Sequence, residues 1–456
     1  MEFQEGGVQH PTFIDLFAGC GGLSLGLCEA GWKGRFAIER ATDAFETFRV
    51  NFLSAGGRHR FEWPVDLEKR AFSIEEVLEK WGHKLHELQG EVDLIAGGPP
   101  CQGFSFAGKR YASDPRNKMF QKYVEFVDLV RPKFLILENV PGMGVAHKDG
   151  RGTQRTTFYE KLVSELEVIG YDAKGKLLDA AGFGVPQRRR RLVVLGVKRE
   201  LIPGLVESLN VGNSLGLIDS IFKGAEDEGE LQLARFGPKK VTAQEAISDL
   251  AIGGDEGREL IEYEGETSPR GYQQISYRGP KTVYQLHMNG GALAMDSMRL
   301  AKHSKLVADR FQRILNETQG RRGRNLSADH RTSLNMLKHR VVPMDPDAPA
   351  PTLTTLPDDV LHYSDPRILT VREYARLQSF PDWFVFRGKY TTGGNLRKVE
   401  SPRYTQVGNA VPPLLGRALG ASLMKVLDGQ RLRSNKVISS RGASSEHEDA
   451  CSLELG

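Results

Sequence analysis

Five short apolar runs, separated by longer and more polar stretches, occupy the first two hundred residues of this chain. The runs cover residues 12–17, 35–39, 92–97, 133–139 and 191–197. Their apolar character is nearly continuous and does not alternate, which is typical of strands that are covered on both faces. Between them, residues 120–130 repeat apolar side chains at helical spacing. This order of elements predicts an α/β fold built on a parallel sheet.

The rest of the chain divides by composition. Residues 201–348 are more polar, carry clusters of acidic and basic residues, and have poor periodicity, which favours a smaller, loop-rich lobe. Periodicity returns in residues 349–430, where we expect one helix to open the stretch 370–384 and another to cover 411–427. Residues 431–456 are polar and rich in serine, so we expect a disordered tail.

The overall composition excludes several classes of protein. The chain has 62 Lys and Arg against 58 Asp and Glu, a net charge of +4, so a polyanionic partner would have to be held by local basic patches. The four cysteines show no C-x-x-C spacing, so we expect no disulfide framework, no zinc site and a reducing compartment. We find no signal peptide and no apolar run long enough to span a bilayer.

A glycine-rich turn follows the first apolar run, in the stretch DLFAGCGGLSLGL. Gly19 and Gly21 lie where a strand has to turn sharply into a helix, which lets a ligand approach the backbone. Glu39 ends the second run, where a carboxylate can accept hydrogen bonds from ribose hydroxyls. Ser24 stands where a nicotinamide fingerprint requires a third glycine, so the pattern indicates a nucleoside cofactor other than NAD. The alternative is a tight turn that binds no ligand.

The stretch GGPPCQGFSFAGKR, residues 97–110, contains the strongest candidate for a reactive group. Cys101 follows two prolines just past the carboxyl end of a predicted strand, at the edge where open α/β sheets bind their ligands. The prolines restrict the backbone before Cys101, which suits a nucleophile, although a buried structural cysteine is the alternative. The spacing G-x-x-x-x-G-K also resembles a phosphate-binding loop, but Arg110 occupies the position that requires Ser or Thr.

Two further strand ends carry candidate groups. Glu138 lies at the end of an apolar run, where it is either a proton donor or a plain surface residue. In the stretch QRRRR, an extended backbone would point Gln187, Arg189 and Arg191 to one side and the two other arginines to the opposite side. Because this stretch continues into a buried strand, we expect one of its faces to look toward the site.

Six blocks in the chain resemble, in their order, the DNA (cytosine-5)-methyltransferase family. They are DLFAGCGG, GGPPCQGFS, ENV, GVPQRRRR, LTVREYARLQSFPD and QVGNAVPP. The resemblance implies a Rossmann-like S-adenosylmethionine-dependent methyltransferase domain over residues 1–200, completed by residues 349–430, with residues 201–348 as a target-recognition lobe. It also implies methyl transfer to carbon 5 of a flipped-out cytosine in duplex DNA, through a covalent bond between Cys101 and the cytosine.

The same resemblance implies roles for individual residues. Glu138 would protonate ring nitrogen 3, Arg191 would bind the carbonyl oxygen of the cytosine, and Arg189 would support both. The cofactor contacts that it implies are Phe17, Gly19, Gly21, Glu39, Asp66, Pro100 and Asn409. The DNA contacts that we expect are Gln102, Ser105, Lys109, Arg110, Arg116, Gln187, Arg321, Arg322 and Arg324. No metal ion is expected.

Three alternatives remain at this point: a tRNA cytosine-5 methyltransferase, a catalytically silent DNA-binding protein and a nicotinamide oxidoreductase. The sizeable lobe over 201–348 favours DNA over tRNA as substrate. The combination of Cys101, Glu138 and the Gln-x-Arg-x-Arg pattern disfavours a silent binder, and Ser24 disfavours the oxidoreductase. We expect a monomeric bacterial enzyme in the cytoplasm, associated with the nucleoid when it binds DNA and paired with a cognate restriction endonuclease.

Overall fold

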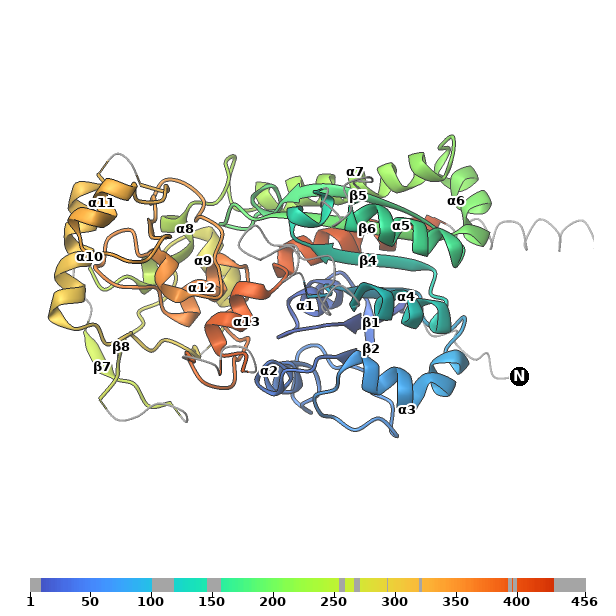
Figure 1. Ribbon diagram of the computed structural model, residues 1–456, viewed down its shortest axis with the longest axis horizontal. Helices are drawn as coiled ribbons and strands as arrows, with labels where there is room; N and C mark the ends of the chain where they lie inside the picture. The colour runs from blue at the N-terminus through green and yellow to red at the C-terminus, as the bar shows by residue number, and fades with distance from the viewer. Residues whose placement is uncertain are drawn as a thin grey trace, which may run out of the picture.

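The computed structural model describes residues 10–100, 119–145, 157–253, 259–265, 271–292, 294–319, 322–392, 396 and 400–429 of the chain. In this part of the chain a six-stranded sheet with helices on both sides forms the larger lobe, and a smaller lobe lies beside it (Figure 1). The order of strands in the sheet is β2-β1-β3-β4-β6-β5. The predicted α/β class is therefore confirmed.

All five predicted strands are present, and the sheet contains a sixth. Its strands are β1 (Thr12–Leu16), β2 (Lys33–Ile38), β3 (Leu94–Gly97), β4 (Phe134–Asn139), β5 (Tyr171–Asp179) and β6 (Arg190–Lys198). The first four pair in parallel, whereas β6 is antiparallel to both β4 and β5. The prediction of an all-parallel sheet was wrong here, because the link from β5 to β6 is too short for the crossover that parallel neighbours require. Sequence reasoning missed β5, an edge strand whose residues are only partly buried.

Two layers of helices cover the sheet. One consists of α3 (Ile74–Glu87), α4 (Met119–Val130) and α5 (Phe158–Val168), with α4 in contact with both of the others. The other consists of α1 (Gly22–Glu29), α7 (Ser214–Ala234) and a helix over residues 413–429. The last helix lies between α1 and α7, since Trp32 after α1 donates its indole N–H to Gly420 O and the Ser422 hydroxyl donates to Ile221 O in α7. The C-terminal segment thus packs into the larger lobe.

The stretch after β6 differs from the loop-rich expectation. Residues 202–234 form α6 (Ile202–Leu209) and the long helix α7, which packs against β5 of the sheet. Helical periodicity is hard to see in the sequence because α7 contains Gly224 and Gly229. A Cβ on Gly229 would come within 2.6 Å of the Phe183 ring, so the glycine is required by close packing and not by a loop. We propose that the second lobe begins after Ala234.

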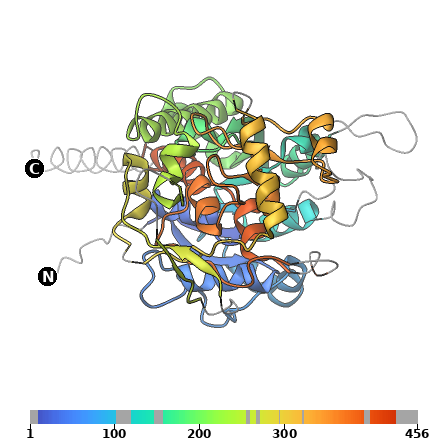
Figure 2. The same cartoon turned by 90° about the vertical axis from the view of Figure 1, so that its left-hand side faces the viewer.

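The second lobe is built from short elements around a small core of its own. Its helices are α8 (Ala243–Ile247), α9 (Val283–Asn289), α10 (Lys305–Glu317), α11 (Ala328–Ser333) and α12 (Val371–Leu377). Its short strands are β7 (Leu260–Glu262), β8 (Gln273–Ile275), β9 (Val342–Pro343) and β10 (Val360–Leu361). The core is apolar and consists of Phe311, Ile314, Leu326, Leu334, Val341, Leu361 and Ile368. Figure 2 views this lobe end on.

Two more helices, α2 (Thr42–Phe52) and α13 (Arg403–Asn409), lie where the lobes meet and contact each other. The block that begins with α12 carries buried charges. Arg376 is 0% exposed and forms ion pairs with Asp249 at 3.0 Å and Asp382 at 2.6 Å. Removing one partner of such a pair costs far more folding free energy than the intact pair contributes, because it leaves the other charge buried without a partner. These residues therefore have to be retained together. We assign this part of the block to holding the lobe together.

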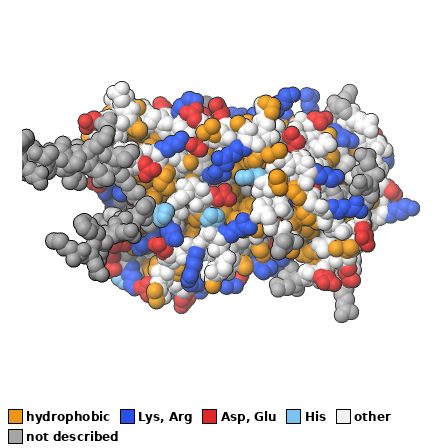
Figure 3. Space-filling view, turned by 180° about the vertical axis from the view of Figure 1, so that it is seen from behind, with side chains coloured by type: hydrophobic (Ala, Val, Ile, Leu, Met, Phe, Trp, Pro, Cys, Tyr) orange, Lys and Arg blue, Asp and Glu red, His pale blue; other side chains and the backbone are white. Residues whose placement is uncertain are grey.

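Surface charge and hydropathy agree with the overall composition. Basic and acidic side chains are interspersed on the face in Figure 3, so a polyanion would have to be held by local groups. In the part of the chain that the structure describes, we find no helix long and apolar enough to cross a membrane.

Candidate active site

The turn after β1 adopts the backbone conformation that its glycines predict. Gly19 and Gly21 have φ angles of +58° and +95°, in the left-handed region that favours glycine. Phe17 has a φ of +60°, which is costly for an aromatic residue, about 1–3 kcal/mol. Such strain is typical of ligand-binding turns. A Cβ on Gly19 would meet no atom within 4 Å, so the space over this turn is open.

Glu39, at the carboxyl end of β2, is tied to the same turn. Its carboxylate accepts a hydrogen bond from Gly19 N–H at 2.9 Å and another from Ala41 N–H at 2.7 Å. Burial raises the pKa of the Glu39 carboxyl above its ordinary value, and the two N–H donors oppose that shift. Each carboxylate oxygen has a second lone pair, so Glu39 can still accept a hydrogen bond from a ligand. Glu39 therefore holds the turn, and the ribose contact that the sequence indicated stays a prediction.

Asp15 and Ser24 lie beneath this turn and were not identified as site residues from the sequence. Asp15, in β1, is 1% exposed, and the buried Ser24 hydroxyl donates a hydrogen bond to Asp15 Oδ2 at 2.5 Å. Burial raises the pKa of Asp15 to about 7, which the Ser24 hydrogen bond opposes. The serine that departs from the nicotinamide pattern thus supplies the partner of a buried carboxyl. A signal was present, since Asp15 is the one charged residue of the strand TFIDL.

Glu138 and Arg191 form an ion pair at the carboxyl end of β4. Arg191 Nε lies 2.6 Å from Glu138 Oε1, and both side chains are largely buried. A Cβ on Gly98 would lie 3.3 Å from Glu138 Oε2, so a glycine lets the chain after β3 pass close to the carboxylate. Asn139 Nδ2 donates to Pro99 O at 3.1 Å. The segment that leads to Cys101 is therefore fixed beside Glu138.

The predicted alternation in residues 187–191 is confirmed. The side chains of Gln187 and Arg189 are buried and that of Arg191 is largely buried, whereas Arg188 and Arg190 are exposed. The side chains that point inward are therefore those of Gln187, Arg189 and Arg191, which the sequence predicts to share one face.

Two of those three residues have structural roles. Gln187 donates its amide N–H to Leu377 O at 3.2 Å and accepts a hydrogen bond from Leu353 N–H at 3.0 Å. Arg189 donates to Leu353 O at 3.1 Å and to Gly408 O at 2.7 Å. The Gln187 amide is buried and engaged, which does not favour the DNA contact expected of it, and that contact stays a prediction. Arg189 likewise connects β6 to the returning segment and does not face the pocket.

A pocket of about 490 Å³ opens beside the Glu138–Arg191 pair. This volume lies within the usual range for small-molecule sites. The pocket is lined by Val140, Pro141, Asp179, Arg188, Arg190, Arg191 and Thr352. Three arginines against one carboxylate favour an anionic or electron-rich ligand.

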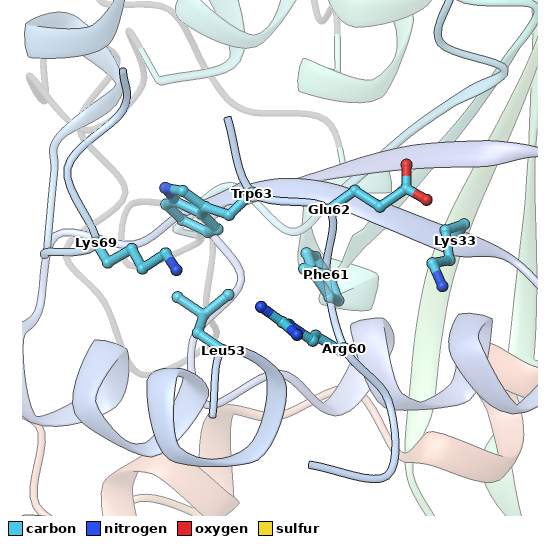
Figure 4. A pocket seen from close by; sticks show the side chains of 7 residues that line it. All are labelled: Lys33, Leu53, Arg60, Phe61, Glu62, Trp63 and Lys69. Carbon is cyan, nitrogen blue, oxygen red and sulfur yellow. The ribbon is translucent and has the colours of Figure 1, made fainter. Parts of the chain in front are cut away.

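A second pocket, of about 420 Å³, lies away from this site (Figure 4). It is lined by Lys33, Leu53, Arg60, Phe61, Glu62, Trp63 and Lys69. Lys33 begins β2, whereas Glu39 follows the other end of the strand. Because ligands of open α/β sheets bind at the carboxyl ends of the strands, this pocket is not the candidate active site.

The remaining cofactor predictions are placed as follows. Pro100 is partly buried at the end of the segment after β3, and Asn409 is exposed at the end of α13. A Cβ on Gly22 would collide with Val411 O, so the segment after α13 does return to the turn. Asp66 is exposed and forms an ion pair with Lys84. The ion pair engages only one oxygen of Asp66, so the carboxylate can still accept a hydrogen bond, and its contact with the adenine stays a prediction.

The remaining residues that we predicted to contact DNA fall into three groups. Arg322 donates to Tyr363 O at 2.6 Å and to Leu315 O at 3.4 Å, so its guanidinium holds the second lobe together and the expected DNA contact is not favoured. Arg324 is exposed and stays a candidate. The others, and the predicted nucleophile, lie outside the described residues and remain predictions: Cys101, Gln102, Ser105, Lys109, Arg110, Arg116 and Arg321. Among the described residues no group of three or more His, Cys, Asp or Glu side chains could hold a metal ion.

Three features define a methyltransferase of the α/β class: the six-stranded sheet, the glycine turn after β1, and the Glu138–Arg191 ion pair beside residues 98–100. The chain belongs to the family of C-5 cytosine-specific DNA methylases, which it matches over residues 11–425. It is 31% identical to the type II methyltransferase M.DdeI of Desulfomicrobium norvegicum, over 90% of this chain and 87% of that protein. It is also 31% identical to the type II methyltransferase M1.HphI of Haemophilus parahaemolyticus, over 91% and 87%.

A solved structure shares the fold. It is a prophage-encoded E. coli protein assigned as a DNA modification methyltransferase, with a TM-score of 0.55, 24% identity, and coverage of 92% of this chain and 99% of that chain. The resemblance that the six blocks indicated is confirmed by these comparisons. The protein is a DNA (cytosine-5)-methyltransferase by family, which excludes the nicotinamide oxidoreductase.

Proposed function

We propose that this enzyme methylates carbon 5 of a flipped-out cytosine in one specific duplex DNA sequence, with S-adenosylmethionine as methyl donor and Cys101 as nucleophile. The observation that carries the proposal is the Glu138–Arg191 ion pair, because it lies beside a 490 Å³ pocket and beside the segment that leads to Cys101. An acid, a cationic anchor and a nucleophile at one strand edge are the groups that this chemistry needs.

The chemistry assigns a task to each group. Carbon 5 of cytosine is too weak a nucleophile to take a methyl group directly. Addition of the Cys101 thiolate to carbon 6, with a proton delivered from Glu138 to nitrogen 3, makes the ring an enamine whose carbon 5 is nucleophilic. Arg191 holds the Glu138 carboxyl in place and can donate to the cytosine carbonyl oxygen. Carbon 5 would then take the methyl group from the sulfonium, whose sulfur leaves as a neutral thioether. Loss of the carbon-5 proton to a base, return of the nitrogen-3 proton to Glu138 and expulsion of the Cys101 thiolate restore the aromatic ring.

The turn after β1 fits the proposed cofactor. The space over Gly19 is open, and Glu39 retains lone pairs for ribose hydroxyls. Phe17, in the same turn, is partly buried against the core, and we propose that the remaining exposed part of its ring stacks on the adenine. When bound, S-adenosylmethionine would supply an electrophilic methyl group at a sulfonium.

Base flipping is part of the proposal because the reaction needs access to carbon 6 of the cytosine. Carbon 6 of a stacked cytosine is shielded, and extrusion from the duplex costs a few kcal/mol, which contacts in the pocket and along the backbone offset. Arg188 and Arg190 are exposed on the pocket rim, where phosphates of the target strand can reach them. Lys109, Arg110 and Arg116 remain candidates for further phosphate contacts.

The test is to express the chain in a host that lacks cytosine methylation and to map protected cytosines in its genome by bisulfite sequencing. Protection within one short repeated motif supports the proposal and reveals the target sequence. A genome without protected cytosines, from well-expressed protein, would refute DNA as substrate. Transfer of labelled methyl groups to tRNA would then support the RNA alternative.

The nucleophile has its own test. Cys101→Ser should abolish turnover and leave the affinity for S-adenosylmethionine nearly unchanged, because a hydroxyl at neutral pH is a far weaker nucleophile than a thiolate. Cys451→Ser serves as a matched control and should keep full activity. Full activity of Cys101→Ser would refute the covalent mechanism.

The partner, the cellular compartment and the oligomeric state of the enzyme are also proposals. Two of its relatives are named as type II methyltransferases, which supports a paired restriction endonuclease. We further propose a bacterial, cytoplasmic enzyme that acts as a monomer and associates with the nucleoid through its DNA substrate.

A further inference from the structure

The 420 Å³ pocket beside the edge strand β2 has more cations in its lining than acidic groups that could neutralise them. The lining contains three basic residues, Lys33, Arg60 and Lys69, and one acidic residue, Glu62. The Glu62 carboxylate is already engaged, because its Oε2 lies 3.7 Å from Nη1 of Arg35. The pocket therefore carries an excess of positive charge.

These three cations have no ion-pair partner within the part of the chain that the structure describes. Several other basic residues of the same lobe differ in this respect, because each is paired with a carboxylate. The paired residues are Arg35, Arg49, Arg70, Lys80 and Lys84. Unpaired cations that share one pocket repel one another, and a bound anion would remove that repulsion.

The aromatic part of the pocket wall is buried and fixed. Phe61 is 4% exposed, and its ring centroid lies 5.1 Å from that of Phe48 in the core. A Cβ on Gly34 would come within 2.3 Å of the Phe61 ring, so the glycine lets this ring lie against β2. Trp63 is also buried, and its indole N–H donates to Leu67 O at 2.8 Å. Walls of low dielectric constant focus the field of the cations in a cleft, which strengthens their attraction for an anion.

The arrangement of the cations suits an anion with several charged groups. In Figure 4 the Arg60 guanidinium and the Lys69 ammonium point toward one another across Leu53, and Lys33 lies on the other side of Phe61. A guanidinium can bind a phosphate group through two parallel hydrogen bonds, and an ammonium group binds one as a compact charge. The volume of 420 Å³ lies within the range of small-molecule sites. A chain of phosphate groups therefore matches both the charge and the size of the pocket.

We infer that this pocket binds the phosphate groups of an oligophosphate, which is either the phosphate chain of a free nucleotide or a stretch of DNA backbone outside the target sequence. Arg60 and Lys69 bind one end of the chain of phosphates, and Lys33 binds the other. The site is distinct from the proposed cofactor site, because S-adenosylmethionine contains no phosphate and the glycine turn lies at the opposite end of β2 from Lys33. This inference goes beyond the proposed function and does not depend on it.

The test measures the binding of inorganic triphosphate to the full chain by isothermal titration calorimetry at about 150 mM salt, where charges far from the ligand are screened. Three proteins are compared. They are the wild type, a pocket variant with Arg60→Gln and Lys69→Gln, and a control variant with Arg49→Gln and Lys80→Gln. The control removes the same amount of positive charge from exposed side chains of α2 and α3 that do not line the pocket.

We expect the wild type to bind triphosphate, the pocket variant to bind it about 10-fold or more weakly, and the control variant to stay within about 2-fold of the wild type. Absence of binding to the wild type, or an equal loss of affinity in the two variants, would overturn the inference. Displacement of triphosphate by S-adenosylmethionine would also overturn it, because the anion would then occupy the cofactor site.

Competition experiments identify the source of the phosphates. Displacement of triphosphate by ATP assigns the pocket to a nucleotide. Displacement by a duplex that lacks the target sequence, together with a loss of affinity for that duplex in the pocket variant, assigns it to the DNA backbone. If neither competitor displaces triphosphate, the inference fails. None of these measurements involves methyl transfer, so they leave the proposed function to its own test.

Discussion

Replacing Asp15 by Asn should remove a large part of the pH dependence of stability. Asp15 lies under the turn after β1, 1% exposed, and burial raises its pKa from 3.8 to about 7. The native state thus holds a proton that the unfolded chain releases. The stability that this group contributes is complete below pH 3.8, declines as the pH rises and is lost above about pH 7. Within this window the loss is about 1.4 kcal/mol per pH unit, or about 4 kcal/mol in all.

Urea-induced unfolding, followed by circular dichroism at about pH 5, 6, 7 and 8, measures this effect. Asp15→Asn exchanges no proton and can still accept the Ser24 hydrogen bond, so its stability should fall less steeply between about pH 5 and 7. Asp128→Asn, which removes an exposed carboxylate paired with Arg131, is the control and should keep the wild-type slope. If Asp15→Asn lost stability with pH as steeply as the wild type, Asp15 would not be the titrating group and the argument from burial would fail.

Two buried arginines give further predictions. Arg189→Met removes the donor to Leu353 O and to Gly408 O. We therefore expect the free energy of unfolding, measured by urea titration, to fall by about 2–4 kcal/mol. A loss below about 0.5 kcal/mol would contradict the structural role of Arg189. Arg376→Met leaves the carboxylates of Asp249 and Asp382 buried without their cation, and should cost about 3–5 kcal/mol. Replacing both carboxylates by amides in the same variant should recover part of that loss in thermal unfolding, and no recovery would refute the ion-pair explanation.

Much of the candidate site could be predicted from the chain because it depends on local backbone geometry. Gly19 and Gly21 indicated a left-handed turn after a strand, and both have positive φ. The alternation of the arginine run predicted which side chains share a face, since successive residues of an extended chain face opposite sides, and the structure shows which of the two faces is buried. These inferences needed only neighbours in sequence.

Other features could not be predicted from the sequence because they depend on pairing between distant segments. Strand β5 has partly polar residues at the edge of the sheet, so its apolar signal is weak. The direction of β6 depends on its link to β5, and the helical character of α7 is obscured by Gly229, which is there because Phe183 packs against it. Sequence spacing carries no information on such contacts.

The α/β class, the glycine turn, the candidate acid Glu138 and the alternation of residues 187–191 could all be predicted from the sequence alone, since each follows from periodicity and from the conformations that single residues allow. The contacts of Gln187 and Arg189 with carbonyl and amide groups of the returning segment became visible only once the chain was folded. The tertiary structure also decided that Asp15 is buried against Ser24. The physical reason is that a polar side chain takes its role from the partners within hydrogen-bond distance, and folding brings those partners from remote parts of the chain.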